Sequence, residues 1–149
     1  KGKDTIRIYS IHLQSVKISA DINEKIDEAK SKFILKRLSL AFGKQQQQSE
    51  IISEHFENCP YPKIICSDLN NSAFSYVYRT IKGNMKDTFE EAGTGFGKSY
   101  NFKYYPARID FILVDDAIQV KQFKSIDTFF QSDHFPQIVR LNLEEKVEK

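Results

Sequence analysis

The sequence predicts a single α/β (α+β) domain with a sandwich-like arrangement. Strand-like runs rich in β-branched and aromatic residues alternate with helical stretches, and two consecutive runs near the end are spaced as a hairpin. Helices that lie between and after strands, with a hairpin near the end, favour a sandwich over a doubly wound parallel sheet. The 149 residues are about the length of one domain and can bury a sizeable core.

The composition is that of a globular chain. Hydrophobic residues make up 40% of it and charged residues 28%, which is too apolar for a disordered segment. The formal net charge of +2 is too small to indicate a polyanionic partner without a local basic patch. Cys59 and Cys66 make no disulfide framework, and Cys66, inside an apolar run, is expected to be a small buried side chain. No apolar run approaches the roughly 20 residues of a membrane span.

The first strand is predicted over Thr5–Leu13, where residues that favour β-structure partly alternate. Ile6 and Ile8 belong to one face of this strand, and Tyr9 and Ile11 to the other. Because both faces carry apolar side chains, the strand is expected to be covered on both sides. His12 then falls at its carboxyl end.

A long helix is predicted next. Asp21 and Glu24 have the spacing of a capping box, and a helical pattern follows to about Asn58. Gly43 costs about 1 kcal/mol relative to Ala in a helix interior, which predicts a bend or break there. The glutamines at 45–48 are good helix formers. The apolar face recurs at steps of three and four residues, at Ile34, Leu38, Ala41, Phe42, Ile52 and Phe56.

Pro60 and Pro62 end that helix, and Lys63–Ser67 reads as a short buried strand. Asp68 and Asn70 follow directly, in a strand-to-helix loop of the kind that often carries chemistry. A second helix is then predicted from Ala73 to about Ile81, with Asn71 or Ser72 as its cap. Its apolar face is expected to comprise Phe74, Val77, Tyr78 and Ile81.

The region from Gly93 to Lys98 is rich in glycine, but it lacks the Gly-Lys-Ser/Thr ending of a nucleotide-binding P-loop at the right offset. Aromatic and basic residues alternate after it. Two interpretations stay open: the rings stack on a nucleic acid or another phosphorylated ligand, or they pack a hairpin onto the core. The residues concerned are Tyr100, Phe102, Tyr104 and Tyr105 with Lys98, Lys103 and Arg108.

The C-terminal third is predicted to be β-structure. Arg108–Val114 is a strong strand, Asp115–Asp116 a turn, and the segment from Ala117 to about Ile126 its hairpin partner. A last strand is expected over Phe135–Leu143. Residues 144–149 are expected to form a frayed tail.

Polar residues stand at the ends of several of these strands. His134 beside Asp133, before the last strand, is typical of an acid/base element, because histidine titrates near neutral pH. Asp110 is expensive to bury unless it is paired. It either forms a salt bridge with Arg108 or lies at an exposed edge, or else it orients an imidazole. Asp68 and Asn70 offer an acceptor and an amide two residues apart, which suits an attacking water and a phosphate oxygen.

Four motifs in order carry a family resemblance: Ile11–Ser15 (IHLQS), Ser67–Asn70 (SDLN), Arg108–Leu113 (RIDFIL) and Ser132–Pro136 (SDHFP). Together they resemble the endonuclease/exonuclease/phosphatase superfamily, which includes deoxyribonuclease I, abasic-site endonucleases, sphingomyelinases and inositol-phosphate phosphatases. The resemblance covers nearly the whole chain and is closest to uncharacterised bacterial members. It implies a deoxyribonuclease I-like β-sandwich flanked by helices.

The resemblance also implies residue roles. His134 matches the family's catalytic histidine at the attacking water, and Asp110 matches the carboxylate that orients it. Asp68 and Asn70 match the pair that positions the nucleophile and contacts the scissile phosphate. Whether His134 or Asp68 is the base stays open.

Further residues are assigned to the substrate and the metal on the same grounds. His12 matches a histidine that hydrogen-bonds the phosphate oxygens, with Ser15 assisting. Asp133 matches a residue that contacts the divalent metal, Mg²⁺ or Mn²⁺. Tyr100 and Arg108 are expected to bind substrate on different grounds, the alternation of aromatic and basic residues described above.

Two departures from the family pattern stand out. The family loop is usually Gly-Asp-Phe-Asn, and here Ser67 and Leu69 replace the glycine and the ring. The main metal ligands of the family, an Asn or Asp after its first strand and a Glu, belong to an N-terminal half that nothing before Thr5 supplies. We therefore expect residues 1–149 to be the C-terminal part of the catalytic domain, and nearly inactive alone.

The function implied is that of a Mg²⁺-dependent phosphoesterase, a nuclease among the options, that hydrolyses a phosphodiester or phosphomonoester with an activated water. The substrate is a nucleic acid, a lipid head group or a sugar phosphate; the sequence does not choose between them. The alternative is a noncatalytic phosphate-binding or interaction module that keeps the pocket but not the metal site. Bacterial members often carry N-terminal membrane helices, which leaves a membrane-anchored parent protein open.

Overall fold

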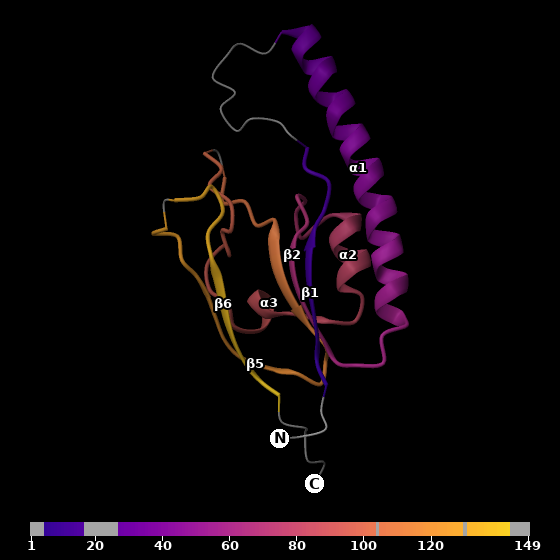
Figure 1. The fold of residues 1–149 in the computed structure, drawn as a ribbon. Coiled ribbons are helices and arrows are strands. Elements are labelled where there is room, and N and C mark those ends of the chain that lie inside the picture. Colours follow the sequence, from indigo (N-terminus) through magenta and orange to yellow (C-terminus); the bar gives the residue numbers. More distant parts are fainter. Residues whose placement is uncertain (1–4, 17–26, 104, 130, 144–149) are drawn as a thin grey trace.

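The computed structural model describes residues 5–16, 27–103, 105–129 and 131–143 (Figure 1). In chain order the elements are β1 (Arg7–His12), α1 (Glu28–Glu57), β2 (Lys63–Asp68), α2 (Tyr76–Lys82), β3 (Lys86–Asp87), α3 (Thr88–Ala92), β4 (Asp110–Val114), β5 (Gln119–Ser125) and β6 (Gln137–Asn142). Helices and strands alternate as far as β4 and two more strands follow, which confirms the predicted α+β class.

The strands form two sheets. The larger sheet has four strands in the order β1-β2-β4-β3, with β1 parallel to β2 and the other neighbours antiparallel. The smaller sheet is the antiparallel pair β5 and β6. Helices α1 and α2 lie along one side of the larger sheet and β5 and β6 along the other (Figure 1). The sheet is therefore the middle layer of a sandwich.

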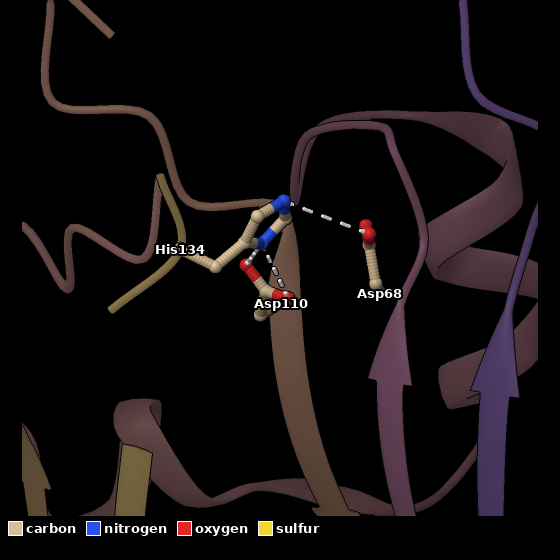
Figure 2. A group of neighbouring side chains, drawn as sticks. All are labelled: Asp68, Asp110 and His134. Atoms are coloured by element: carbon tan, nitrogen blue, oxygen red, sulfur yellow. Dashed lines mark hydrogen bonds and ion pairs between the residues drawn. The ribbon is translucent and has the colours of Figure 1, made fainter. Parts of the chain in front are cut away.

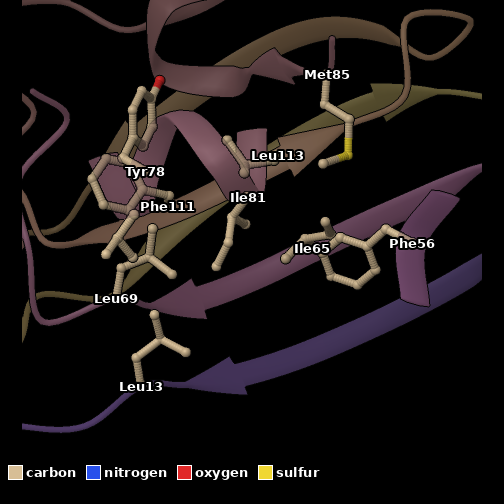
Figure 3. Close-up of a cluster of buried hydrophobic side chains, with 10 residues drawn as sticks. Leu13, Phe56, Ile65, Leu69, Tyr78, Ile81, Met85, Phe111 and Leu113 are labelled. Atoms are coloured by element: carbon tan, nitrogen blue, oxygen red, sulfur yellow. The ribbon is translucent and has the colours of Figure 1, made fainter. Parts of the chain in front are cut away.

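The larger core cluster lies between the sheet and the helices (Figure 3). Successive side chains of a strand point to opposite faces, so Ile65 of β2 and Leu113 of β4 share this side. The ring of Tyr78 from α2 packs on that of Phe111, with centroids 4.7 Å apart. The buried members of the cluster are Leu13, Phe56, Ile65, Leu69, Val77, Tyr78, Ile81, Met85, Phe111 and Leu113.

A smaller cluster fills the opposite side of the sheet. Ile64 of β2 and Ile112 and Val114 of β4 point away from the helices and pack with Ile118, under the smaller sheet. Partly buried residues of β5 and β6 complete the layer, namely Val120, Val139 and Leu141. Strand β4 is thus buried on both faces, which fits its continuous apolar run.

The predicted hairpin between β4 and its successor is wrong. Strand β4 pairs with β2 and β3, whereas β5 pairs with β6 in the other sheet. Asp115, which directly follows β4, is bonded to β2 and so does not begin a hairpin turn. Its side chain accepts the N–H of Lys63 at 2.6 Å and its N–H donates to the Lys63 carbonyl at 3.0 Å. Since β2 already occupies that flank of β4, the chain leaves the sheet after Asp115.

The expected burial of β1 on both faces is also wrong. Ile8 is 67% exposed, and Ser10 and His12 on the same face are exposed too. Cys66, on the corresponding face of β2, is exposed instead of being the buried side chain predicted. The smaller sheet covers Ile64 but does not extend over this part of the sheet.

Helix α1 begins at Glu28, where the Asp27 side chain accepts the N–H of Lys30 at 2.7 Å as the N-cap. The capping box predicted at 21–24 lies outside the described residues. The helix continues through Gly43, so a break there is wrong, whereas the alternative of a bend stays a prediction. A Cβ at Gly43 would meet nothing within 4 Å, and the buried residues on either side, Ala41 and Gln45, hold the helix against the domain. Phe42 is 44% exposed and is not part of the core.

The second helix starts later than predicted. The Ser75 side chain caps α2 by accepting the N–H of Tyr78, so neither Asn71 nor Ser72 is the cap. Phe74 consequently precedes the helix and is 88% exposed, although the rest of the predicted face is buried. The short elements β3 and α3 were not predicted, because two and five residues are too few to show a period. The tail at 144–149 lies outside the described residues.

Among the described residues, no helix is long and apolar enough to cross a membrane.

A buried ion pair ties β3 and α3 to the start of β4. Arg108 donates from its guanidinium to Asp87 Oδ2 at 2.6 Å, and the two side chains are 12% and 1% exposed. The Tyr78 hydroxyl donates to the same oxygen at 2.8 Å. The guanidinium also lies over the rings of Phe89 and Phe111, 4.7 and 4.8 Å from their centroids. Arg108 therefore belongs to the packed interior.

Replacing Arg108 by Leu is expected to lower the free energy of unfolding by about 3–5 kcal/mol, because Asp87 then stays buried without its cation. Urea denaturation measures the loss. Lys32→Leu is the control: Lys32 pairs with Glu28 at the exposed surface of α1, where an ion pair contributes little. Equal stability of the two variants would contradict the assignment of Arg108 to the interior.

Candidate active site

Three polar residues meet at one edge of the larger sheet because of strand direction. The carboxyl ends of the parallel strands β1 and β2 lie side by side, and the antiparallel strand β4 begins at the same edge. His12 is in register with Asp68, and Asp68 with Asp110. The sequence predicted each residue at a strand end, and the pairing brings them together.

His134 completes the group from outside the sheet (Figure 2). Its Nδ1 lies 2.9 Å from Asp110 Oδ2 and 3.1 Å from Oδ1, and its Nε2 lies 3.9 Å from Asp68 Oδ2. An ionised carboxylate only accepts, so Nδ1 carries the proton and donates to Asp110. The lone pair of the neutral ring is then at Nε2, directed toward Asp68. The arrangement is that of a base and its orienting carboxylate.

Ser99 holds this pair in place. Its fully buried Oγ accepts the N–H groups of Ile109 and Asp110, each at 3.0 Å. Its carbonyl accepts the N–H of Phe135 at 2.8 Å, next to His134. One residue therefore fixes both the start of β4 and the segment that carries the imidazole. No local pattern in the sequence predicts this role of Ser99.

Burial raises the pKa of the Asp110 carboxyl, although hydrogen bonds from Ser99 and His134 oppose the shift. The cost of desolvating the charge is therefore only partly offset by its partners. The charged form of Asp110 is therefore favoured by a close hydrogen-bond donor, and His134 is placed to be one.

Asp68 is oriented by its own loop. Its Oδ1 accepts the N–H of Asn70 at 2.9 Å, and its Oδ2 lies 3.4 Å from His12 Nε2 as well as facing His134. Asn70 has a positive φ of 49°, a conformation that Asn adopts more readily than most residues. The Asn70 side chain donates to the Leu13 carbonyl at 3.3 Å, which joins the loops after β1 and β2.

Ser67 and Leu69, the two positions at which this loop departs from the usual Gly-Asp-Phe-Asn pattern, are both buried. Leu69 is fully buried in the larger core cluster. Ser67 is buried and donates from Oγ to the Phe111 carbonyl at 3.2 Å, across the β2–β4 pair. Side chains other than the usual glycine and ring thus occupy these positions while Asp68 and Asn70 keep a tight turn.

An open cleft of ≈ 440 Å³ lies at this edge of the sheet, and Asp68 and His134 are in its wall. Polar and apolar side chains share its wall: His12, Ser15, Asp68, Asn70, Asp133 and His134 with Val16, Leu38, Tyr100, Phe102, Tyr105, Ala107 and Ile109. Asp68 and Asp133 bring negative charge, and the described wall contains neither Lys nor Arg. An anion entering the cleft therefore meets carboxylates, and among the described lining residues only the two imidazoles can carry positive charge.

Aromatic rings form one side of the cleft. The Tyr100 ring packs edge-on against His134, with centroids 4.9 Å apart, and the Phe102 and Tyr105 rings are 4.8 Å apart. Tyr105 is 61% exposed, so these rings face the cleft more than the core. Burial, with the nearby charges of Asp133 and Asp68, raises the pKa of the Tyr100 hydroxyl. Tyr104, part of the predicted alternation, lies outside the described residues.

The sequence-predicted set is thus brought together except at one position. Asp110 accepts a hydrogen bond from His134 and does not itself line the cleft. The predicted residues that line it are His12, Ser15, Asp68, Asn70, Tyr100, Asp133 and His134. Arg108 does not line it but pairs with Asp87. Gln45, which joins two loops of the site, was not predicted. The four-residue step from Ala41 to Gln45 placed it on the buried face of the helix and was the signal available.

A candidate metal group comprises Asp68, Asp110 and His134, whose ligand atoms lie within 4.8 Å of one another. Two carboxylates suit a hard divalent cation such as Mg²⁺ or Mn²⁺, which prefers oxygen ligands. Asp133 lines the same cleft but is not one of the three. The donor set fits a divalent cation.

No protein-family model matches the chain, and no curated protein matches it. Solved structures do. An endonuclease/exonuclease/phosphatase from Bacteroides vulgatus is 26% identical over 70% of this chain and 46% of its own, with a TM-score of 0.60. A functionally unknown conserved protein from Enterococcus faecalis is 24% identical over 69% and 46% (TM-score 0.57). The human Nocturnin catalytic domain with bound sulfate is 14% identical over 89% and 45% (TM-score 0.54).

The chain spans less than half the length of each of these structures. It nevertheless has the α+β fold of the endonuclease/exonuclease/phosphatase proteins, which confirms the resemblance carried by the four motifs.

Asp110→Asn is expected to remove a pH dependence of stability. Because the folded-state pKa of Asp110 is raised, the native state binds more protons than the unfolded state above about pH 4, and stability falls as the pH rises through the folded pKa. The amide variant lacks this loss and still accepts the Nδ1–H of His134. Urea denaturation from about pH 3 to 6.5 should therefore show the variant gaining on the wild type with increasing pH.

The exposed Asp127→Asn is the matched control for removing one carboxylate. A constant stability difference between Asp110→Asn and wild type across the pH range would show that burial of Asp110 carries no such cost.

Proposed function

We propose that this chain, which has the fold of the endonuclease/exonuclease/phosphatase proteins, carries the base, its orienting carboxylate and the phosphate-contacting residues of a metal-dependent phosphoesterase. The reaction is hydrolysis of a phosphodiester or phosphomonoester by an activated water. One observation supports it most: His134 donates from Nδ1 to Asp110, and its Nε2 faces Asp68 across the cleft.

His134 is the proposed base. With Nδ1–H held by Asp110, the neutral ring presents its lone pair at Nε2, which accepts a proton from a water lying beside Asp68. Asp68 Oδ2 accepts the second hydrogen of that water and so orients its oxygen for attack. The imidazolium that forms is stabilised by Asp110. This division of roles assigns the base to His134 and the positioning of the water to Asp68.

His12 and Asn70 are the proposed phosphate contacts. His12 is exposed at the cleft, 3.4 Å from Asp68 through Nε2, and donates to a phosphate oxygen when it is protonated. Donors aimed at the oxygens on which charge develops stabilise the transition state of phosphoryl transfer. Ser15, at the same end of the cleft, is a further proposed contact.

Asp68, with Asp110 and His134 nearby, would hold a divalent cation, and Asp133, which lines the same cleft, would be a further acidic ligand. Such an ion would neutralise phosphate charge and act as a Lewis acid. The charge of the cleft supports the assignment, because its described wall has two carboxylates and no Lys or Arg. Mg²⁺ or Mn²⁺ is the proposed cation.

Turnover by the protein that contains this chain should depend on His134 and on the metal. On a chromogenic phosphodiester with Mg²⁺, His134→Ala is expected to lower kcat about 10²–10⁴-fold, as loss of a general base does. Chelation with EDTA should abolish turnover. His55→Ala is the control, since His55 is exposed on α1 and contacts Tyr9 instead of the cleft.

Full turnover by His134→Ala would contradict the proposed base. Phosphate binding without any turnover would instead favour the noncatalytic phosphate-binding module. The expectation that residues 1–149 alone hydrolyse little stays a prediction, and the same assay tests it: chelator-sensitive turnover by this chain alone would contradict it.

The rings beside His134 are proposed to bind the non-phosphate part of the substrate. Phe102→Leu is expected to raise KM about fivefold or more for aryl or nucleoside esters, since aromatic stacking contributes about 1–3 kcal/mol per base and 1.4 kcal/mol is tenfold. It should leave KM for an alkyl phosphoester unchanged. Phe96→Leu is the control, because Phe96 is 79% exposed and lines a different hollow. Equal KM changes for both ester classes would argue against a stacking role.

A further inference from the structure

Gln45 of α1 is a fully buried polar side chain whose hydrogen bonds all leave its own helix. Its Nε2 donates to the carbonyl of Gln14 at 2.7 Å and lies 3.4 Å from the carbonyl of Asn70. Its Oε1 accepts from Asn71 Nδ2 at 2.9 Å. One carboxamide thus contacts both the loop that follows β1 and the loop that follows β2.

The orientation of this amide is fixed by its partners. Carbonyl oxygens only accept, so the Gln45 nitrogen must face Gln14 and Asn70, and its two hydrogens match the two carbonyls. The remaining oxygen meets the NH₂ group of Asn71. Both N–H groups and one acceptor position of the oxygen are therefore used, and a flipped amide would place its oxygen against two carbonyl oxygens.

The two loops carry the polar residues of the cleft. Gln14 follows His12 by two residues, and Asn70 follows Asp68 by two. The loops also bond to each other: Leu13 N–H donates to the Asp68 carbonyl at 2.9 Å, and Asn70 Nδ2 donates to the Leu13 carbonyl. From α1, Gln48 Oε1 accepts the N–H of Gln14 at 3.0 Å. Helix α1 therefore bonds to both loops beside the residues through which the loops bond to each other.

We propose that Gln45 is a positioning residue, which sets the separation of His12 and Asp68 by clamping the loops that follow them. The 3.4 Å approach of His12 Nε2 to Asp68 Oδ2 is the geometry that this clamp maintains. The consequence for turnover rests on the function proposed above, whereas the clamp itself does not. A displacement of about 1 Å in a reacting group can lower a rate about 10²-fold, so a loosened clamp has a measurable cost.

Ser49, one turn further along α1, shows what a merely structural polar residue does here. It is equally buried, but its Oγ donates to the Gln46 carbonyl of its own helix. Replacing Ser49 by Ala changes the packing of the same helix face without touching either loop. Gln47→Met, at an exposed position of the same glutamine run, controls for the substitution itself.

The experiment compares Gln45→Met, Ser49→Ala and Gln47→Met in the full 149-residue chain by amide hydrogen exchange. Two amides report on the loops: Leu13, which donates to the Asp68 carbonyl, and Asn70, which donates to Asp68 Oδ1. The amide of Leu113, in the central strand β4, reports on the sheet. A general loss of stability accelerates all three, so the ratio of loop to sheet exchange isolates the loops.

Gln45→Met should raise this ratio at least tenfold, and Ser49→Ala and Gln47→Met should leave it within twofold of wild type. An unchanged ratio in Gln45→Met would overturn the proposal. The measurement needs no turnover, so it decides the clamp even if the proposed phosphoesterase activity fails.

Gln45→Glu adds a pH signature that a space-filling role would not produce. The introduced carboxylate has no hydrogen to donate to the Gln14 and Asn70 carbonyl oxygens that it would face. Their proximity disfavours its charged form and raises its folded-state pKa. The protonated form keeps one donor and one acceptor, so the loops hold at low pH and loosen as the pH rises through that pKa. The exchange ratio should therefore return toward wild type on acidification. A ratio that does not change with pH would count against the clamp.

In the protein that contains this chain, Gln45→Met should lower kcat about 10- to 100-fold, with KM changed much less, when assayed well below its melting temperature. Ser49→Ala should keep wild-type kcat there even if it melts earlier. A raised exchange ratio with unchanged kcat would overturn the positioning role.

Discussion

The antiparallel pairing of β2 with β4 is the interaction on which the candidate site depends. It places the start of β4 beside the end of β2, so that Asp110 comes into register with Asp68. It also buries the apolar run of β4 on both faces, between the helices and the smaller sheet. The hydrophobic effect that fixes the register of this strand therefore fixes the separation of the two carboxylates as well, because a one-residue slip would expose the core face.

Much of this arrangement could be predicted from local sequence. Apolar periods and proline breaks located β1, α1, β2 and β6, and polar residues at strand ends identified His12, Asp68, Asp110 and His134. The pairing of the strands was predicted wrongly at one point. The segment after Asp115 looked like the second strand of a hairpin, but a side chain bonded to Lys63, far away in sequence, turns the chain to the other sheet. A contact between residues so far apart in the sequence cannot be predicted from the local sequence pattern.

The supporting residues were missed for the same reason. Ser99 and Gln45 act through backbone groups 10 or more positions away, and a serine or a glutamine in a chain says nothing of such partners. Their burial is what distinguishes them, since a buried polar side chain must find partners or lose stability. Both residues hold the backbone beside the reactive groups. The candidate site residues could thus be named from residue types, but the geometry that supports them required the fold.

Charge then limits what this geometry can do by itself. Asp68 faces two imidazoles, and Asp133 lies on the same wall, with no Lys or Arg among the described residues that line the cleft. A phosphoester brings further negative charge, and like charges repel strongly where water is partly excluded. Protonated imidazoles would relieve the repulsion, but a protonated His134 has no lone pair left to accept a proton from water. The proposed base and a bound anion would therefore tolerate each other only if positive charge came from elsewhere, and a divalent cation at this site would supply it.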